Sequence, residues 1–242
     1  MKIIMLQKTQ GIVFRTIKFS ETSVVSKIYT EKFGLQSYIV NGVRSARSRT
    51  RASLLQSLSL LDMEVYHREH RNLNRIKEMQ AAVVFRSIPF NLVKGSVGLF
   101  MIEILGKCIH EEEANEPLFH FLFQKIKSLD ESGSVPSGFL VEFLLELSVY
   151  LGFHPNGSST EHAPYFNLRE GIFIASGNGL PNTLDAQLSK ELSLFMQRTG
   201  AALPAAMRRL LLEAMLQYYQ LHVPNFSMPK SLKVLEEVFR TN

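Results

Sequence analysis

The hydrophobic period of this chain changes near residue 85, and few folds accommodate such a change. Before that point, segments rich in Val, Ile and Tyr alternate with short turns, as β-strands do. We expect five strands, near residues 11–19, 23–30, 34–40, 57–68 and 74–85. After Pro89 the apolar residues recur at helical spacing. The sequence therefore predicts an α+β protein with two domains, residues 1–85 and 86–242.

Five strands joined by short turns favour a small closed barrel, and the OB type is the commonest nucleic-acid-binding version. A β-sandwich or an SH3-like barrel gives nearly the same pattern, so both stay open at this point. The second domain is expected to be helical, with helices near 91–110, 116–131, 137–151, 183–198, 204–222 and 229–240. Residues 164–176 break the helical period and predict a small hairpin insertion.

Four arginines lie between Gly42 and Ala52 with no acidic residue among them: Arg44, Arg47, Arg49 and Arg51. The stretch has no hydrophobic period, so we expect a solvated loop between the third and fourth strands. Closely spaced guanidinium groups repel one another unless an anion lies between them, and their planar forks match phosphate. The segment therefore favours nucleic-acid binding over the simpler alternative of a loop charged for solubility.

The basic surplus is local. Residues 1–80 contain 14 Lys and Arg against 6 Asp and Glu, whereas the rest of the chain is slightly acidic. This asymmetry indicates an N-terminal binding module and a different task for the helical part. A single cysteine, Cys108, excludes an internal disulfide, and no apolar run approaches the length of a membrane span. We expect a cytoplasmic, nucleoid-associated protein.

Signals for catalysis, metals and cofactors are weak. His67 and His70 have a spacing of three, but such positions point to opposite faces of a strand and no further ligand accompanies them. No phosphate-binding loop, nucleophile elbow or carboxylate cluster with metal spacing is present in the sequence. The sequence therefore predicts a binding protein rather than an enzyme, with neither metal nor cofactor.

Short motifs follow one another along the chain, beginning with Gly11–Phe14 and Thr30–Leu35. In the order and spacing of these motifs, the chain resembles the bacterial RecO family of recombination mediators over about 230 residues, and Thr30–Leu35 matches a strand–turn–strand signature of that family. Gly42-Val43-Arg44 resembles its basic loop. In the second half, Glu142–Phe153 resembles its central helix, and the segments 208–222 and 230–235 resemble its C-terminal helix pair. Each motif is short, and their order and spacing carry the combined signal.

The resemblance implies an OB domain, a helical domain, and DNA binding with strand annealing without nucleotide hydrolysis. It also implies partnership with RecR and with the single-stranded-DNA-binding protein, and help in loading a recombinase. Many members carry a four-cysteine zinc site after the central helix. This chain has no cysteine between Gly152 and Phe166, so we expect no structural zinc and a hairpin held by its apolar side chains.

Residue roles follow from this hypothesis. Arg15 and Lys27 are expected to assist the four arginines in neutralising phosphates on single- and double-stranded DNA. Three aromatic residues of the barrel are candidates for base stacking if they face outward: Phe14, Tyr29 and Tyr38. The acidic, apolar tail of the single-stranded-DNA-binding protein needs cations at the rim of its pocket, and the candidates are Arg208, Arg209, Lys230 and Lys233. An RNA-binding OB module without a recombination role is the alternative function.

Overall fold

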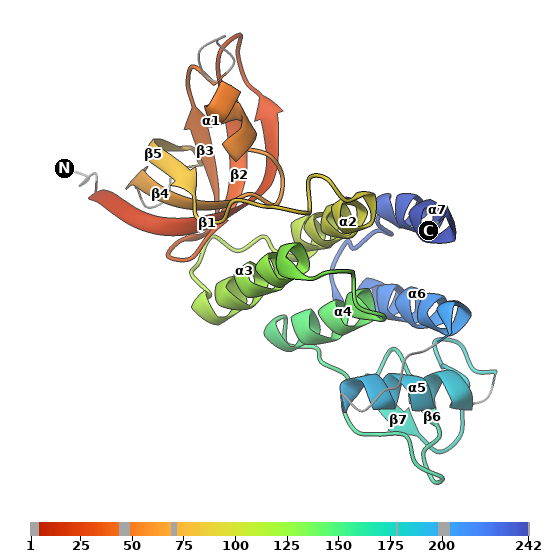
Figure 1. Ribbon diagram of the computed structural model, residues 1–242. Helices are drawn as coiled ribbons and strands as arrows, with labels where there is room; N and C mark the ends of the chain where they lie inside the picture. The colour runs from red at the N-terminus through yellow and green to blue at the C-terminus, as the bar shows by residue number, and fades with distance from the viewer. Residues whose placement is uncertain (1–4, 44–48, 69–71, 178, 198–203, 242) are drawn as a thin grey trace. The chain divides into compact units, whose positions relative to one another are not determined.

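A closed five-stranded barrel forms the first part of the computed structural model, which describes residues 5–43, 49–68, 72–177, 179–197 and 204–241 (Figure 1). Its strands are β1 (Met5–Lys18), β2 (Val24–Thr30), β3 (Gly34–Val40), β4 (Leu60–His67) and β5 (Asn74–Ala81). They follow one another around the barrel in the order β1-β2-β3-β5-β4, and β4 pairs with β1 to close it. All neighbours are antiparallel except β3 and β5. The predicted OB-type fold is confirmed.

The length of β1 makes closure possible. Its first part pairs with β4 from Met5 to Ile12, and its second part pairs with β2 from Gly11 to Lys18. A bulge between Val13 and Arg15 lies where the strand passes from one partner to the other. Residues of all five strands fill the interior, including Val13, Ile28, Tyr38, Leu61, Val65 and, partly buried, Ile76. Alternation along each strand therefore leaves one set of side chains for the outer surface.

The segment between β3 and β4 differs from the expected loop. Helix α1 (Arg49–Leu54) occupies its second half. Leu55, directly after the helix, is buried in the barrel core, and the Thr16 hydroxyl donates to the Leu55 carbonyl at 2.7 Å. Val43, before the segment, is also a core residue. Both ends of the arginine-rich segment are thus fixed to the barrel by buried apolar side chains, which the polar composition of its middle does not reveal.

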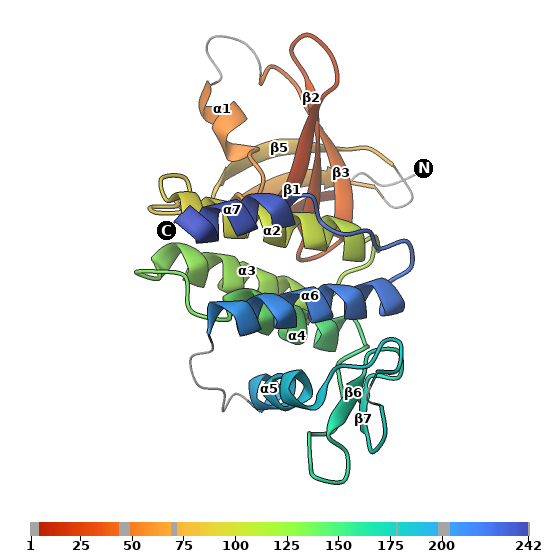
Figure 2. The same ribbon diagram turned by 90° about the vertical axis from the view of Figure 1, so that its right-hand side faces the viewer.

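Residues 1–133 and 229–242 form one compact unit, and residues 134–228 form a second. The first unit contains the barrel together with α2 (Leu92–Cys108), α3 (Glu116–Glu131) and α7 (Ser231–Thr241). Helix α7 lies beside α2 in both views (Figures 1 and 2). The second unit contains α4 (Phe139–Tyr150), the hairpin β6 (Tyr165–Asn167) and β7 (Ile172–Ile174), α5 (Ala186–Met196) and α6 (Ala205–His222). The expected helices and hairpin are all present.

Asp130 fixes the segment that leads from the barrel to α2. Its carboxylate accepts hydrogen bonds from the backbone N–H groups of Arg86, Ser87 and Ile88 at 2.8, 2.9 and 2.8 Å. Strand β5 ends at Ala81 rather than near 85. The segment after it is held at residues 86–88 by these bonds to the Asp130 side chain instead of by a strand ladder. The buried ammonium group of Lys94 donates to the Ser87 hydroxyl and to the Asp130 and Ser132 carbonyls.

The charge of Asp130 is essential to this arrangement. Burial alone would raise the pKa of its carboxyl, but the three backbone N–H groups and the Ser87 hydroxyl outweigh it and hold the pKa below its usual value. We predict that Asp130→Asn lowers the free energy of unfolding by about 3 kcal/mol, because a neutral amide cannot accept all these bonds. Chemical denaturation at pH 7 measures the change.

Glu131→Gln is the matched control, because the Glu131 side chain is 63% exposed and pairs with Lys127 across the helix surface. It should change the free energy of unfolding by less than about 0.5 kcal/mol.

The effect of Asp130→Asn should also depend on pH, because the folded-state pKa of Asp130 is depressed. The Asp130 carboxylate stabilises the folded state fully above the pH at which this group ionises in the unfolded chain. This stabilisation is lost as the pH falls through the folded-state pKa. Equal effects of both substitutions, or an effect of Asp130→Asn that is the same at every pH, would contradict the prediction.

Candidate nucleic-acid interface

Arg15 and Lys27 lie directly opposite each other on β1 and β2. Arg15 is exposed and Lys27 is half-buried, whereas Val13 and Ile28, the preceding pair in the register, are in the core. The pair therefore faces outward, immediately after the bulge. Like charges at directly opposite positions repel, so this pair costs stability unless an anion binds there. The structure brings these two predicted site residues together.

The four arginines of the segment after β3 are only partly described. Arg44 and Arg47 lie outside the described residues. Arg49 and Arg51 have their backbone in α1, and their side chains are not described. The two ends of the segment, at Val43 and Leu55, lie at the same barrel that carries Arg15 and Lys27. The contact of the four arginines with phosphate stays a prediction.

The three aromatic residues expected to stack on bases are buried instead. Phe14 and Tyr29 are 5% and 2% exposed, and their ring centroids lie 5.8 Å apart. Tyr29 also packs against Phe119 of α3 at 6.1 Å. Tyr38 is fully buried inside the barrel, where burial raises the pKa of its hydroxyl. Their aromatic character serves packing, because the helices of the first unit cover part of the outer barrel surface.

Two cations that the sequence analysis missed line a small groove. Arg75 and Lys77 of β5 face a cavity of about 120 Å³ between β3 and β5, together with Ile39, Val40 and Asn41. Strands β3 and β5 pair only at Tyr38–Asn74 and Ile39–Arg75. The groove opens beyond these pairs, where β3 ends and leads into the arginine-rich segment. The groove is revealed only by the pairing of β3 with β5, two strands far apart in sequence. The alternation of Asn74-Arg75-Ile76-Lys77 nevertheless indicates a basic outward face on β5.

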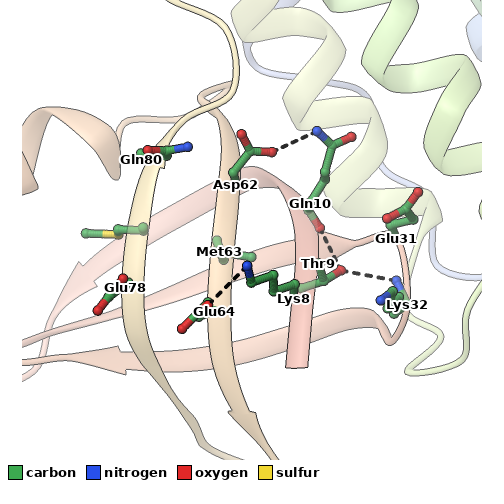
Figure 3. A pocket seen from close by; sticks show the side chains of 11 residues that line it. Lys8, Thr9, Gln10, Glu31, Lys32, Asp62, Met63, Glu64, Glu78 and Gln80 are labelled. Atoms are coloured by element: carbon green, nitrogen blue, oxygen red, sulfur yellow. Dashed lines mark hydrogen bonds and ion pairs between the residues drawn. The ribbon is translucent and has the colours of Figure 1, made fainter. Parts of the chain in front are cut away.

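A second pocket on the barrel, of about 610 Å³, has mixed charge (Figure 3). It lies over β1, β4 and β5, and its charged lining residues are Lys8, Glu31, Lys32, Asp62, Glu64 and Glu78. Glu64 lies 3.0 Å from the Lys77 ammonium and 3.6 Å from that of Lys8. The hydrogen bond from Lys77 is the main reason that the pKa of Glu64 is lowered. With four carboxylates and two lysines, this pocket repels phosphate, so we place the anion-binding surface elsewhere on the barrel.

The candidate residues for a partner's tail are divided between the two units. Arg208 and Arg209 lie on α6 in the second unit. Arg208 donates to the Ser137 hydroxyl at 3.0 Å, and Arg209 pairs with Glu213 one helical turn later at 3.2 Å. Lys230 and Lys233 belong to the first unit, at the start of α7. The structure therefore does not place all four residues on one unit, and each pair needs its own test.

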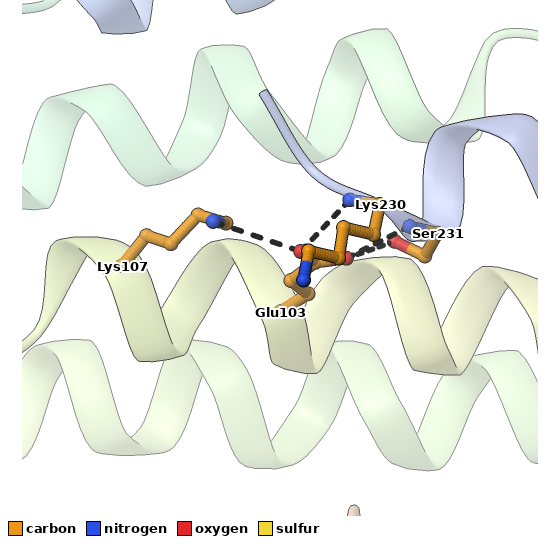
Figure 4. A network of polar contacts seen from close by, with 4 residues as sticks. All are labelled: Glu103, Lys107, Lys230 and Ser231. Atoms are coloured by element: carbon orange, nitrogen blue, oxygen red, sulfur yellow. Dashed lines mark hydrogen bonds and ion pairs between the residues drawn. The ribbon is translucent and has the colours of Figure 1, made fainter. Parts of the chain in front are cut away.

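Glu103 of α2 anchors the beginning of α7 (Figure 4). Its carboxylate accepts from the backbone N–H groups of Lys230 and Ser231 at 2.8 and 2.9 Å, and from the Ser231 hydroxyl at 2.7 Å. Lys107 lies 3.6 Å away on the next turn. A carboxylate at a helix N-terminus also complements the helix dipole. Lys230 and Lys233 therefore lie at the anchored beginning of α7, and the side chains of both lysines are exposed.

Among the described residues, no group of three or more His, Cys, Asp or Glu side chains is arranged to hold a metal ion. No helix in the described part of the chain is long and apolar enough to cross a membrane.

Comparison with known proteins gives a consistent result. The N-terminal model of recombination protein O matches residues 1–85, and its C-terminal model matches residues 89–232. The chain is 36% identical to a protein named DNA repair protein RecO from Flavobacterium psychrophilum, over 96% of this chain and 98% of the relative. A protein of the same name from Phocaeicola vulgatus is 35% identical over 97% of this chain and its own full length. The chain belongs to the RecO family. This membership supports a role in DNA repair and recombination, in a family of mediators rather than a known class of enzyme.

The residues after α4 do not fit the zinc site expected of many RecO proteins, since this chain has no cysteine there. The described contacts instead join the hairpin to α5 and α6. Phe166 is fully buried, lies 5.0 Å from Phe173 and 6.0 Å from Tyr218, and donates its backbone N–H to the Ser189 hydroxyl. His222 stacks on Phe153 at 5.4 Å and lies 2.9 Å from the Leu168 carbonyl. Aromatic packing and backbone hydrogen bonds hold this hairpin.

We predict that Lys27→Gln stabilises the protein by about 0.5 kcal/mol, because it removes the repulsion between Lys27 and Arg15. Thermal or chemical denaturation without DNA measures the effect. Lys32→Gln, at an exposed lysine of the β2–β3 turn, is the control and should leave stability unchanged. A loss of stability in Lys27→Gln, or an equal gain in both variants, would show that the Arg15–Lys27 pair carries no such cost.

Proposed function

We propose that this protein is a recombination mediator that binds single- and double-stranded DNA, anneals complementary strands and helps to load a recombinase. The observation that carries the proposal is the outward Arg15–Lys27 pair on an OB-type barrel of the RecO family. A directly opposed pair of cations stabilises neither the strands nor the core, and an anionic ligand would remove the repulsion between the two charges. The arginine-rich segment, attached to the same barrel, supplies further cations.

Annealing requires that two polyanions approach each other. Arginine and lysine side chains neutralise phosphates and release their counterions, which lowers the repulsion between the two strands. Contacts of this kind position the backbone and do not read base edges, so binding is expected to depend little on sequence. The protein then acts by bringing strands together rather than by forming or breaking bonds, and we propose no catalytic residue, metal or cofactor.

The four arginines provide the direct test. Replacing Arg44, Arg47, Arg49 and Arg51 with Ala should weaken binding to all DNA sequences alike. The slope of log affinity against log salt should fall by about 0.7 for each lost contact with a single strand. Fluorescence anisotropy of labelled oligonucleotides across a salt series measures both quantities. Lys8→Ala, at a lysine of the mixed-charge pocket, is the control and should keep the wild-type slope.

An unchanged slope in the quadruple variant would refute the role of the segment. Competition between DNA and RNA of the same sequence at matched salt tests the alternative function, an RNA-binding OB module. Stronger binding of RNA, together with failure to anneal DNA strands, would favour that alternative over a recombination mediator.

We further propose that the protein works with RecR, and that its helices receive the acidic, apolar C-terminal tail of the single-stranded-DNA-binding protein. Such a tail needs an apolar surface with cations at its rim. Arg208 and Arg209 precede the apolar stripe of α6, and Lys230 and Lys233 begin α7. Work on DNA in the bacterial cell also requires the protein to be in the cytoplasm, at the nucleoid.

The two pairs of cations allow the tail site to be located. We predict that one of the double variants, Arg208→Ala with Arg209→Ala or Lys230→Ala with Lys233→Ala, weakens binding of a fluorescent tail peptide at least fivefold, since charged rim contacts are lost. Lys125→Ala with Lys127→Ala on α3 is the control of equal charge. Wild-type affinity in both double variants would remove these four residues from the site.

A further inference from the structure

A continuous row of outward side chains winds once around the barrel. The row starts and ends on β1, and each member is the register partner of the next. In order, its members are Leu6, Tyr66, Arg75, Ile39, Val25 and Ile17. Partners on adjacent strands share one face of a sheet, so all six lie on the outer surface. The row crosses five gaps between strands, which gives a path of about 24 Å.

The row is apolar where a barrel surface is ordinarily polar. Leu6, Tyr66 and Ile17 are 45%, 40% and 52% exposed, and Val25 and Ile39 are half-buried. The inward positions of the same strands already supply the core. These outward apolar side chains therefore add nothing to the interior, and a contiguous apolar surface of this kind marks a place where another molecule binds.

The charges beside the row identify that molecule. Arg75 lies within the row, between Tyr66 and Ile39. On one side, two residues along the same strands, are Arg15 and Lys27. On the other side lie Lys8, Glu64 and Lys77, and both of these lysines pair with Glu64. An apolar path with cations along one border matches an unpaired nucleic-acid strand, whose bases present apolar faces and whose phosphates follow along one edge.

Tyr66 is the aromatic member of the row, and its neighbours suit base stacking. It lies opposite Arg75, and Arg75 lines the groove between β3 and β5 together with Lys77. The pKa of Lys77 is raised, mainly by its hydrogen bond with Glu64 and in smaller part by the proximity of Glu78 and Tyr66. A phenol ring beside a guanidinium and an ammonium group can hold a base while the cations hold its phosphate.

We propose that this outer row is the single-strand path of the barrel, on which Tyr66 stacks against a base and Arg75 contacts the adjoining phosphate. This inference rests on the proposed DNA binding and adds to it a reason for preferring unpaired strands. In a duplex the base faces are already stacked, so Tyr66 contributes to binding of single strands only. The path is long enough for about four nucleotides, the smallest site typical of an OB fold.

The experiment compares Tyr66→Ala, Tyr66→Phe and Arg75→Gln in the full-length protein, with Tyr150→Ala as the control. Tyr150 lies on α4 and is 38% exposed, which matches Tyr66. Tyr66→Ala should weaken binding of single-stranded oligonucleotides about tenfold or more, leave duplex binding within twofold and keep the salt slope. Tyr66→Phe should bind as the wild type does, because the ring remains. Arg75→Gln should lower the single-strand salt slope by about 0.7.

Photocrosslinking gives an independent readout. An oligonucleotide carrying 5-iodouracil should crosslink to Tyr66 in the wild-type protein, as located by mass spectrometry. Equal loss of single- and double-strand affinity in Tyr66→Ala, or no loss at all, overturns the inference and leaves the proposed DNA binding intact. Loss of RecR binding in Tyr66→Ala with unchanged DNA affinity assigns the row to a protein partner and also overturns it. Absence of any DNA binding by the wild type overturns both proposals.

Discussion

The hydrogen bonds that Asp130 accepts are the interaction on which the arrangement of the first unit depends. Three successive backbone N–H groups, from Arg86 to Ile88, converge on one carboxylate at the end of α3. The Lys94 ammonium group, fully enclosed, satisfies the carbonyl groups around it. A connecting segment with so many unpaired backbone groups would otherwise need water or a strand partner. Because Asp130 supplies the partner, the segment before α2 is fixed and α2 starts from a defined point.

Within the barrel, the pairing of the strands determines both the core and the candidate binding surface. A single long strand, β1, pairs with β4 and then with β2, and its bulge turns Arg15 outward beside Lys27. Closure then brings residues from distant parts of the chain into one row on the outside, where Tyr66 and Arg75 lie between the two ends of β1. The acidic side chains gather instead over β1, β4 and β5 at the mixed-charge pocket. This separation of charge is the reason that we place the proposed phosphate contacts away from the mixed-charge pocket.

Local patterns in the sequence were sufficient for the strands and for every helix except α1, but not for the surface. The change from strand to helix period predicted the five strands, the helices and the small hairpin, because periodicity depends on neighbours along the chain. It also placed Arg15 and Lys27 together in one module. Burial of Phe14 and Tyr29 was not predictable, because it depends on which outer face α3 covers. Tyr38 is buried for another reason, since it faces the interior of the barrel. Arg75 and Tyr66 were missed for a related reason, since their neighbours are set by strand pairing across the barrel.

The position of α7 has a consequence for how the protein is made. The hydrogen bonds that Ser231 donates to Glu103 join residues 128 positions apart, and Leu235 and Val238 of α7 are buried within the first unit. The whole second unit lies between these two partners in the chain. During synthesis on the ribosome, the barrel and α2 are made early, whereas α7, which completes the first unit, is made only after the whole second unit. Until then the apolar face of α2 that α7 covers stays open, so the second unit can complete its fold before the first.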